Sequence, residues 1–181
     1  MRVISGLYKS RKLVGYNNEK TRPTMDRVKE SMFAMINSYI EGSICLDLFC
    51  GSGSLGIEAL SNGAVLCYFN DCAKDILVKL KDNILNLGIK NCQITNLDYM
   101  EALRKLNSQG VELDIIFIDS PYAMNIIDNI LRYIYDHHML KQNGIIVYEH
   151  ANYTISNQKF TIIKEKKYKD IIVSIIKKDL I

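Results

Sequence analysis

A glycine-rich turn between an apolar strand and a helix is the feature that most restricts the fold of this sequence. The apolar run 44–49 leads into a loop with glycine at alternate positions, and a helical segment follows. Gly51, Gly53 and Gly56 match the spacing G-x-G-x-x-G of strand–turn–helix units that bind dinucleotides. Glycine is needed because a Cβ would obstruct the ligand and because such turns use positive φ angles. The segment therefore predicts a turn that lies close to a ligand.

One acidic residue helps to choose between two ligands for this turn. Asp47 ends the strand, four residues before Gly51. A dinucleotide would bring its anionic pyrophosphate to the helix N-terminus, where a carboxylate adds repulsion. S-adenosylmethionine (SAM) has no phosphate and carries a sulfonium and an ammonium group. Asp47 therefore favours SAM, and the other predicted cofactor-binding residues of this loop are Phe49, Gly51, Ser52 and Gly53.

Strand-like and helix-like segments alternate from residue 44 onward. Five segments resemble buried strands: 44–49, 65–70, 92–96, 114–119 and 145–149. Four helical segments separate them: 54–62, 73–87, 98–107 and 124–138. This alternation predicts a parallel α/β sheet with helices on both faces. Two more strands, 159–166 and 171–177, raise the total to seven and form an antiparallel pair. A turn is expected at 141–144, before the fifth strand.

The N-terminal region differs from this core. Residues 2–14 predict a short hairpin, and Pro23 and Asp26 are helix start signals. We therefore expect one domain over residues 1–181. It would contain a basic hairpin and helix in 1–40 and a Rossmann-like, seven-stranded SAM-binding core in 41–181.

Charge is distributed unevenly along the chain. Residues 1–29 hold eight basic and two acidic side chains, a local charge of +6, and residues 159–181 hold seven lysines and three acids, a local charge of +4. The remaining residues hold eight basic and fifteen acidic side chains, a charge of −7. This pattern suggests an anionic partner held beside a small-molecule site. Solvated surface charge is the alternative, and it is the preferred interpretation for the C-terminal lysines.

Two acidic residues follow later strands. Asp71 lies twenty residues after Gly51, where an acid accepts hydrogen bonds from ribose hydroxyls. It supports a ligand containing adenosine without choosing between cofactors. Asp98 follows the third strand, and we assign it to the exocyclic amine of adenine because strand-end acids point into the ligand crevice. Both residues have an alternative role as helix N-caps, with Glu101 completing a capping box for Asp98.

The segment after the fourth strand carries the second strong signal. Asp119-Ser120-Pro121-Tyr122 resembles the (D/N)-P-P-(Y/F) motif of methyltransferases that act on exocyclic amino groups. A base amine is a poor nucleophile because its lone pair is delocalised into the ring. The Asp119 carboxylate and a following backbone carbonyl can accept hydrogen bonds from both N–H groups of the amine. Together these bonds localise the lone pair and aim it at the SAM methyl group. Tyr122 can stack on a base removed from its helix.

Ser120 departs from this motif, which has proline at that place. The carbonyl is retained, but ring rigidity is lost and an N–H is added. Catalytic efficiency and substrate choice are therefore open at this position. An ordinary Ser-Pro turn after a strand is the alternative interpretation.

Taken together, the sequence resembles the bacterial 16S rRNA guanine(966)-N(2)-methyltransferase family over nearly its whole length. The segments that carry the resemblance are 2–6, 9–13, 21–33 and 47–60. The resemblance implies a class I methyltransferase fold, SAM as methyl donor, and a guanine N2 amine of 16S rRNA as acceptor. It also implies a partner in the 30S subunit or a late assembly intermediate.

The resemblance also implies roles for residues near the N-terminus. Arg22 and Thr24 would face the methionine carboxylate of SAM, although Arg22 could equally hold RNA phosphate. The basic N-terminal residues would clamp the rRNA backbone: Arg2, Lys9, Arg11, Lys12 and Arg27.

Three other functions stay open. A DNA adenine-N6 methyltransferase shares the amine-activating motif, but such enzymes usually need a target-recognition domain that 181 residues hardly accommodate. A catalytically weakened RNA-binding or assembly factor is compatible with Ser120. An NAD(P)-binding oxidoreductase would leave residues 119–122 unexplained.

The remaining features predict neither a metal nor a membrane partner. The five cysteines, an odd number, are interpreted as reduced, small apolar residues, and the three histidines show no spacing typical of metal ligands. No apolar run approaches the roughly 20 residues that span a membrane, and the N-terminus lacks the apolar region of a signal peptide. We therefore expect a cytoplasmic protein, and we expect it to be a monomer.

Overall fold

The computed structural model describes residues 1–15, 22–120, 126–151 and 156–179, with only the backbone described for 22–25. Its strands are β1 (Ile44–Asp47), β2 (Leu66–Asn70), β3 (Cys92–Thr95), β4 (Leu113–Ile118), β5 (Leu140–His150), β6 (Phe160–Tyr168) and β7 (Ile171–Lys178). They form one sheet in the order β3-β2-β1-β4-β5-β7-β6. The first five strands are parallel, and β7 is antiparallel to both of its neighbours. The predicted seven-stranded α/β sheet is confirmed.

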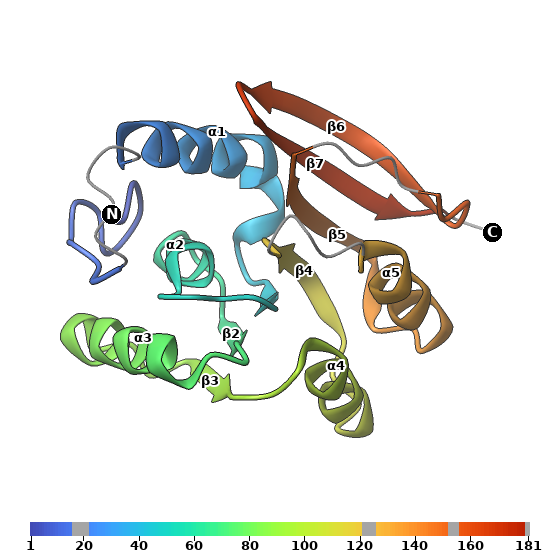
Figure 1. Cartoon of the computed structure of the whole chain (residues 1–181), viewed down its shortest axis with the longest axis horizontal. Helices are drawn as coiled ribbons and strands as arrows, with labels where there is room; N and C mark the ends of the chain where they lie inside the picture. The colour runs from blue at the N-terminus through green and yellow to red at the C-terminus, as the bar shows by residue number, and fades with distance from the viewer. Residues whose placement is uncertain (16–21, 121–125, 152–155, 180–181) are drawn as a thin grey trace.

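Five helices of the described residues cover the two faces of this sheet (Figure 1). They are α1 (Arg22–Ile40), α2 (Ser54–Ser61), α3 (Lys74–Leu87), α4 (Tyr99–Ser108) and α5 (Ile127–Asp136). One core cluster joins α1, α2, α3 and the N-terminal segment to one face, and a second joins α4 and α5 to the other. Successive residues Cys45 and Leu46 of β1 belong to different clusters, as expected for a strand that is buried on both faces. No described helix combines the length and apolar character that crossing a membrane requires.

The predicted N-terminal hairpin forms, and it is short. The chain doubles back over residues 1–14, where Arg2 and Lys12 form an antiparallel bridge and the backbone N–H groups of Val3 and Leu13 donate to the carbonyls of Arg11 and Met1. The backbone N–H groups that would extend a ladder bond to α2 instead. Those of Ile4 and Ser5 donate to Glu58, and that of Tyr8 donates to the Ser61 hydroxyl. The short hairpin is therefore confirmed, and its tip is held on α2.

The predicted turn at 141–144 is wrong, because these residues belong to β5. Leu113 of β4 pairs with Leu140, and the next register pair joins Ile115 to Ile145. The register shift accommodates the extra residues of β5 without breaking the strand. Gly144 permits this, since a Cβ there would lie 2.7 Å from Leu140 Cδ1. Long-range pairing with β4 therefore outweighs a local turn signal.

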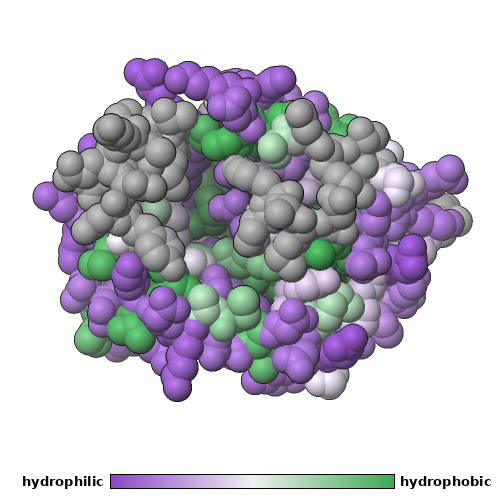
Figure 2. Space-filling view, in the orientation of Figure 1, coloured by the Kyte–Doolittle hydropathy of each residue, from purple (hydrophilic) through white to green (hydrophobic). Residues whose placement is uncertain are grey.

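The strand order places a ligand crevice at the carboxyl ends of β1 and β4. From β1 the chain moves outward to β2 and β3, and it then returns to place β4 on the other side of β1. Open α/β sheets bind ligands at such a reversal of strand order. Asp47 ends β1, and Asp119 follows β4 directly. Figure 2 shows a hollow in this view of the molecule, with hydrophobic residues in its depth.

Candidate active site

The three glycines of the loop after β1 serve different purposes. Gly51 has φ of +53°, and a Cβ built on it would meet no atom within 4 Å. It lines a pocket, so that a side chain there would occupy space open to a ligand. A Cβ on Gly53 would collide with Leu80, and one on Gly56 would collide with Phe69. Ligand approach therefore explains Gly51, whereas close packing explains the other two.

Asp47 is held at the base of this pocket by the first turns of α2. Its side chain is almost fully buried, and its Oδ2 accepts a hydrogen bond of 2.9 Å from the backbone N–H of Gly56. Burial raises the pKa of Asp47 to about 7, with a smaller contribution from Asp71, while the Gly56 hydrogen bond opposes the rise. A buried carboxylate with a raised pKa is poised to gain from a cationic ligand.

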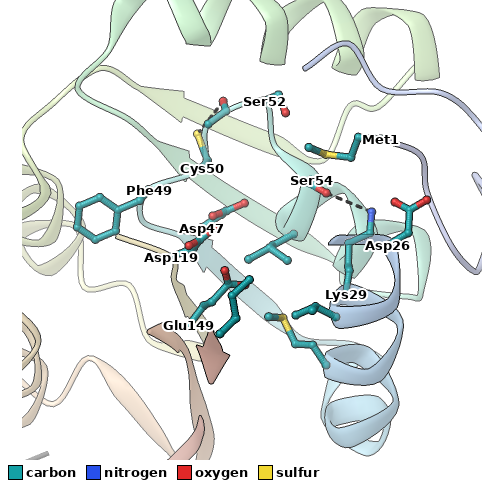
Figure 3. Close-up of a pocket in the computed structure, with 15 residues that line it drawn as sticks. Met1, Asp26, Lys29, Asp47, Phe49, Cys50, Ser52, Ser54, Asp119 and Glu149 are labelled. Atoms are coloured by element: carbon teal, nitrogen blue, oxygen red, sulfur yellow. Dashed lines mark hydrogen bonds between the residues drawn. The ribbon is translucent and has the colours of Figure 1, made fainter. Parts of the chain in front are cut away.

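The pocket brings together predicted residues from separate parts of the chain. Asp47, Phe49, Gly51 and Ser52 line it, and so does Asp119. Figure 3 shows the carboxylates of Asp47 and Asp119 next to each other at the strand ends. The structure therefore unites the two motifs that the sequence singled out, across 72 positions.

Asp119 occupies an acidic part of this pocket. Its pKa is raised well above the usual value, first by loss of surrounding water and then by the charges of Glu149 and Asp47. The Asp119 side chain lines the pocket, but it remains exposed to water. We therefore regard the two neighbouring carboxylates as the firmer cause of the rise. Three acids converge here, which favours a cation over a phosphate.

Two further predicted acids hold loops in place. Asp71 accepts hydrogen bonds of 2.9 Å from the backbone N–H groups of Gly51 and Ala73, and so ties β2 to the glycine loop. Asp98 is the N-cap of α4 and accepts from the N–H of Met100. The N-cap alternative is thus confirmed for Asp98. Neither residue is among those that line the pocket, and their contacts with ribose and adenine stay predictions.

Some predicted site residues cannot be placed by their side chains. Ser120 is buried directly after Asp119, but Pro121 and Tyr122 lie outside the described residues. The backbone of Arg22 and Thr24 forms the start of α1, while their side chains are not described. The roles of these residues remain predictions.

Sequence analysis missed two polar residues of this region. Glu149, near the end of β5, lines the pocket, and the rule applied to the other strand-end acids would have found it. Asn70, at the end of β2, is buried and donates to the carbonyls of Leu48 and Leu97. It fastens the loops after β1 and β3, and no local sequence pattern indicates this.

The predicted RNA-binding residues fall into two groups. Arg2, Lys9 and Arg27 surround one surface depression, together with Asp26 and Glu30; we call it the basic depression. Asp26 also lines the pocket and pairs with Arg2 at 3.3 Å, so the depression and the pocket adjoin.

The second group lies apart from this depression. Arg11 donates to the carbonyl of Asn86 on α3, and Lys12 is exposed.

The cysteines are free thiols, three of them buried. Burial raises the pKa of Cys45 to about 12 and that of Cys67 well above its usual value. Such thiols stay protonated and are poor metal ligands or nucleophiles at neutral pH. Across the described parts of the chain, no three His, Cys, Asp or Glu side chains gather as potential metal ligands.

Comparisons with known proteins agree with this geometry. Residues 1–177 match a family described as conserved hypothetical protein 95. Ribosomal RNA small subunit methyltransferase D of Haemophilus influenzae is 35% identical over 92% of this chain and 88% of its own length. A Bacillus subtilis protein named as a candidate rRNA methyltransferase is 42% identical over 83% of this chain and 82% of its own.

A solved structure extends the likeness to three dimensions. An Escherichia coli protein described as a candidate methyltransferase is 26% identical, with a TM-score of 0.87, over 99% of this chain and 98% of its own. The family resemblance read from the sequence is therefore confirmed. The chain belongs to the family described as conserved hypothetical protein 95 and shares a family with its relative named ribosomal RNA small subunit methyltransferase D.

Proposed function

We propose that this chain is a SAM-dependent methyltransferase that modifies the exocyclic N2 amine of a guanine in 16S rRNA. The observation that carries the proposal is the meeting of Asp47 and Asp119 in one pocket at the carboxyl ends of adjacent strands. Relatives named as rRNA small subunit methyltransferases support the class of substrate. The acceptor atom rests on the amine-activating motif that begins at Asp119.

The pocket fits SAM better than a dinucleotide. Asp47, Asp119 and Glu149 make it acidic, which suits the sulfonium and ammonium groups and opposes a pyrophosphate. Gly51 leaves open space for the ligand, and Phe49 adds an apolar wall. Asp47, Phe49, Gly51 and Ser52 would hold the cofactor, which supplies an electrophilic methyl group when bound.

Asp119 and the backbone that follows it act on the acceptor amine. The carboxylate and the Ser120 carbonyl accept hydrogen bonds from the two N–H groups of the amine. These bonds direct the nitrogen lone pair at the methyl carbon. The nitrogen–carbon bond forms as the carbon–sulfur bond breaks, and the amine then loses one proton. The raised pKa of Asp119 makes its carboxylate a stronger acceptor for that proton.

The decisive test is methyl transfer from labelled SAM to 30S particles that lack the modification, followed by nucleoside mass spectrometry. Appearance of N2-methylguanosine would establish donor, reaction and acceptor atom together. A late assembly intermediate is the parallel substrate, because the family resemblance does not separate the two. SAM binding without transfer to either particle would contradict the proposed substrate, and it would favour the weakened assembly factor.

SAM affinity is expected to rise with pH up to about pH 7. A cation beside Asp47 favours its ionised form, so binding below the pKa of about 7 must release a proton. Calorimetric titrations at pH 6, 7 and 8 would show the rise. Asp47→Asn should bind SAM more weakly and lose the part of the pH dependence between 6 and 7. An unchanged slope in that variant would remove Asp47 as the titrating group.

Removing two charges from the basic depression is expected to weaken binding of 30S particles. Lys9 and Arg27 are exposed and line the depression next to the pocket. Lys9→Ala with Arg27→Ala should make the slope of log affinity against log salt shallower by about one for each RNA phosphate that the variant no longer neutralises. Filter binding over a salt series measures this. Equal slopes for variant and wild type would place the RNA contacts elsewhere.

A further inference from the structure

The end of β6 and the turn that leads to β7 carry two lysines, Lys167 in the strand and Lys169 in the turn beside Asp170. β6 is an edge strand of the sheet, and it is exposed from Thr161 to Lys167. Lys167 and Lys169 are both exposed, and the ammonium group of neither has a hydrogen-bond or ion-pair partner among the described residues. We call these two lysines the turn lysines.

This turn lies at the rim of the candidate active site. Ile171, the first residue after the turn, lines the same pocket as Asp119 and Glu149. The pairing of Glu149 with Val173 keeps the start of β7 beside the end of β5. A chain segment that reaches into the pocket would therefore pass close to the turn lysines.

The turn also continues the surface that begins at the basic depression. Lys164 donates to the Met35 carbonyl and Lys166 to the Ser31 hydroxyl, at 3.0 and 2.9 Å. From Lys164 to Lys166 the strand advances by about 6.6 Å, and from Met35 back to Ser31 the helix covers about 6 Å. The two elements are therefore antiparallel, and their contacts are evenly spaced. In Figure 1 the end of β6 lies beside α1. One helical turn beyond Ser31 is Arg27, which lines the basic depression.

The conformation of Lys169 does not explain why a lysine is there. Its φ is +50°, in the left-handed region where glycine and asparagine are preferred. Lysine adopts this conformation at a disadvantage relative to glycine and asparagine. A positive charge directed to solvent is what lysine adds at this position.

An acidic pocket that receives an RNA base requires cations at its rim. When ionised, Asp47, Asp119 and Glu149 repel the phosphates on either side of a base that enters the pocket. Positive charge on the rim offsets this repulsion without disturbing the cofactor. The turn lysines and the basic depression both adjoin the pocket, through Ile171 and Asp26.

We propose that the β6–β7 turn is a second contact for the RNA phosphate backbone, made by Lys167 and Lys169. This inference rests on the proposed rRNA substrate. Protection of an exposed edge strand is the competing explanation for lysines on β6, although it does not account for the place of the turn at the pocket rim.

The test combines Lys167→Gln with Lys169→Asn in the full chain. Asparagine suits the positive φ of residue 169, so the turn is expected to keep its shape. Without the two ammonium groups, KM for 30S particles should rise roughly five- to tenfold, and the salt slope should become shallower by about one for each lysine. The kcat value and SAM affinity should stay as in the wild type, and Lys167→Arg with Lys169→Arg should restore the slope.

The matched control is Lys90→Gln with Lys105→Gln. Both lysines are exposed, and they lie just before β3 and in the last turn of α4, near the opposite edge of the sheet. This pair should leave KM and the salt slope unchanged.

Four outcomes would overturn the inference. KM and slope could be unchanged in the turn variant, or the control could weaken binding equally. The variant could aggregate while its soluble fraction binds normally, which would assign the lysines to edge protection. A fall in SAM affinity would assign the turn to pocket structure. If the wild type itself transfers no methyl group to 30S particles, the proposed function fails instead, which separates the two failures.

Discussion

Asp119→Ala is expected to lower kcat for methyl transfer by roughly 10²–10³-fold, the effect typical of removing one preorganised polar group from an active site. The Asp119 carboxylate is the group proposed to accept a hydrogen bond from an N–H group of the acceptor amine. SAM affinity should change little, because Asp47 and the glycine loop provide the other side of the pocket. Single-turnover transfer and calorimetry measure the two quantities separately.

Two further variants sharpen this prediction. Asp119→Asn keeps the shape and one acceptor oxygen but lacks the charge, so it should retain more activity than alanine if hydrogen bonding dominates. The control is Asp136→Ala, which removes an exposed acid at the end of α5, just before β5 begins and outside the pocket lining. It should leave kcat and SAM affinity unchanged. Loss of SAM binding together with activity in Asp119→Ala would contradict the division of roles between Asp119 and Asp47.

The fold was predictable because its signals are local and repeated. β4 was expected at 114–119 and lies at Leu113–Ile118, since an uninterrupted apolar run between polar residues has few alternatives in a parallel sheet. The meeting of Asp47 with Asp119 followed from the same pattern. Both residues stand at the carboxyl ends of strands, and those ends share one edge of a parallel sheet.

What escaped prediction depends on contacts between distant segments. Residues 141–144 have the composition of a turn, but pairing of the flanking residues with β4 makes them part of β5. The hairpin at 2–14 forms, but its anchor was not predicted, because Glu58 lies more than fifty positions away and accepts hydrogen bonds from the N–H groups of Ile4 and Ser5. A glutamate within an apolar helix is ambiguous by itself, and only the folded chain shows what it binds.

Glu58→Ala is expected to destabilise the protein by about 3–5 kcal/mol, the effect of breaking a buried ion pair by removing one partner. Glu58 is 1% exposed and lies 2.9 Å from the Lys29 ammonium, which is also buried. The variant leaves this charge unpaired and removes the acceptor of the Ile4 and Ser5 N–H groups. Chemical denaturation monitored by circular dichroism would measure the loss, and Glu112→Ala, an exposed acid before β4, is the control.

The same variant should disturb the pocket more than a simple loss of stability would. Lys29 also donates to the Arg2 carbonyl and the Ser54 hydroxyl, and Met1, Lys29 and Ser54 all line the pocket. Release of the N-terminal segment should therefore increase its cleavage by protease and weaken SAM binding under conditions where the protein stays folded. Glu58→Gln with Lys29→Met removes both charges but keeps an acceptor oxygen, so it should be less destabilised than Glu58→Ala. Equal destabilisation of the two variants would show that neither the charge left on Lys29 nor the lost acceptor of the Ile4 and Ser5 N–H groups explains the effect.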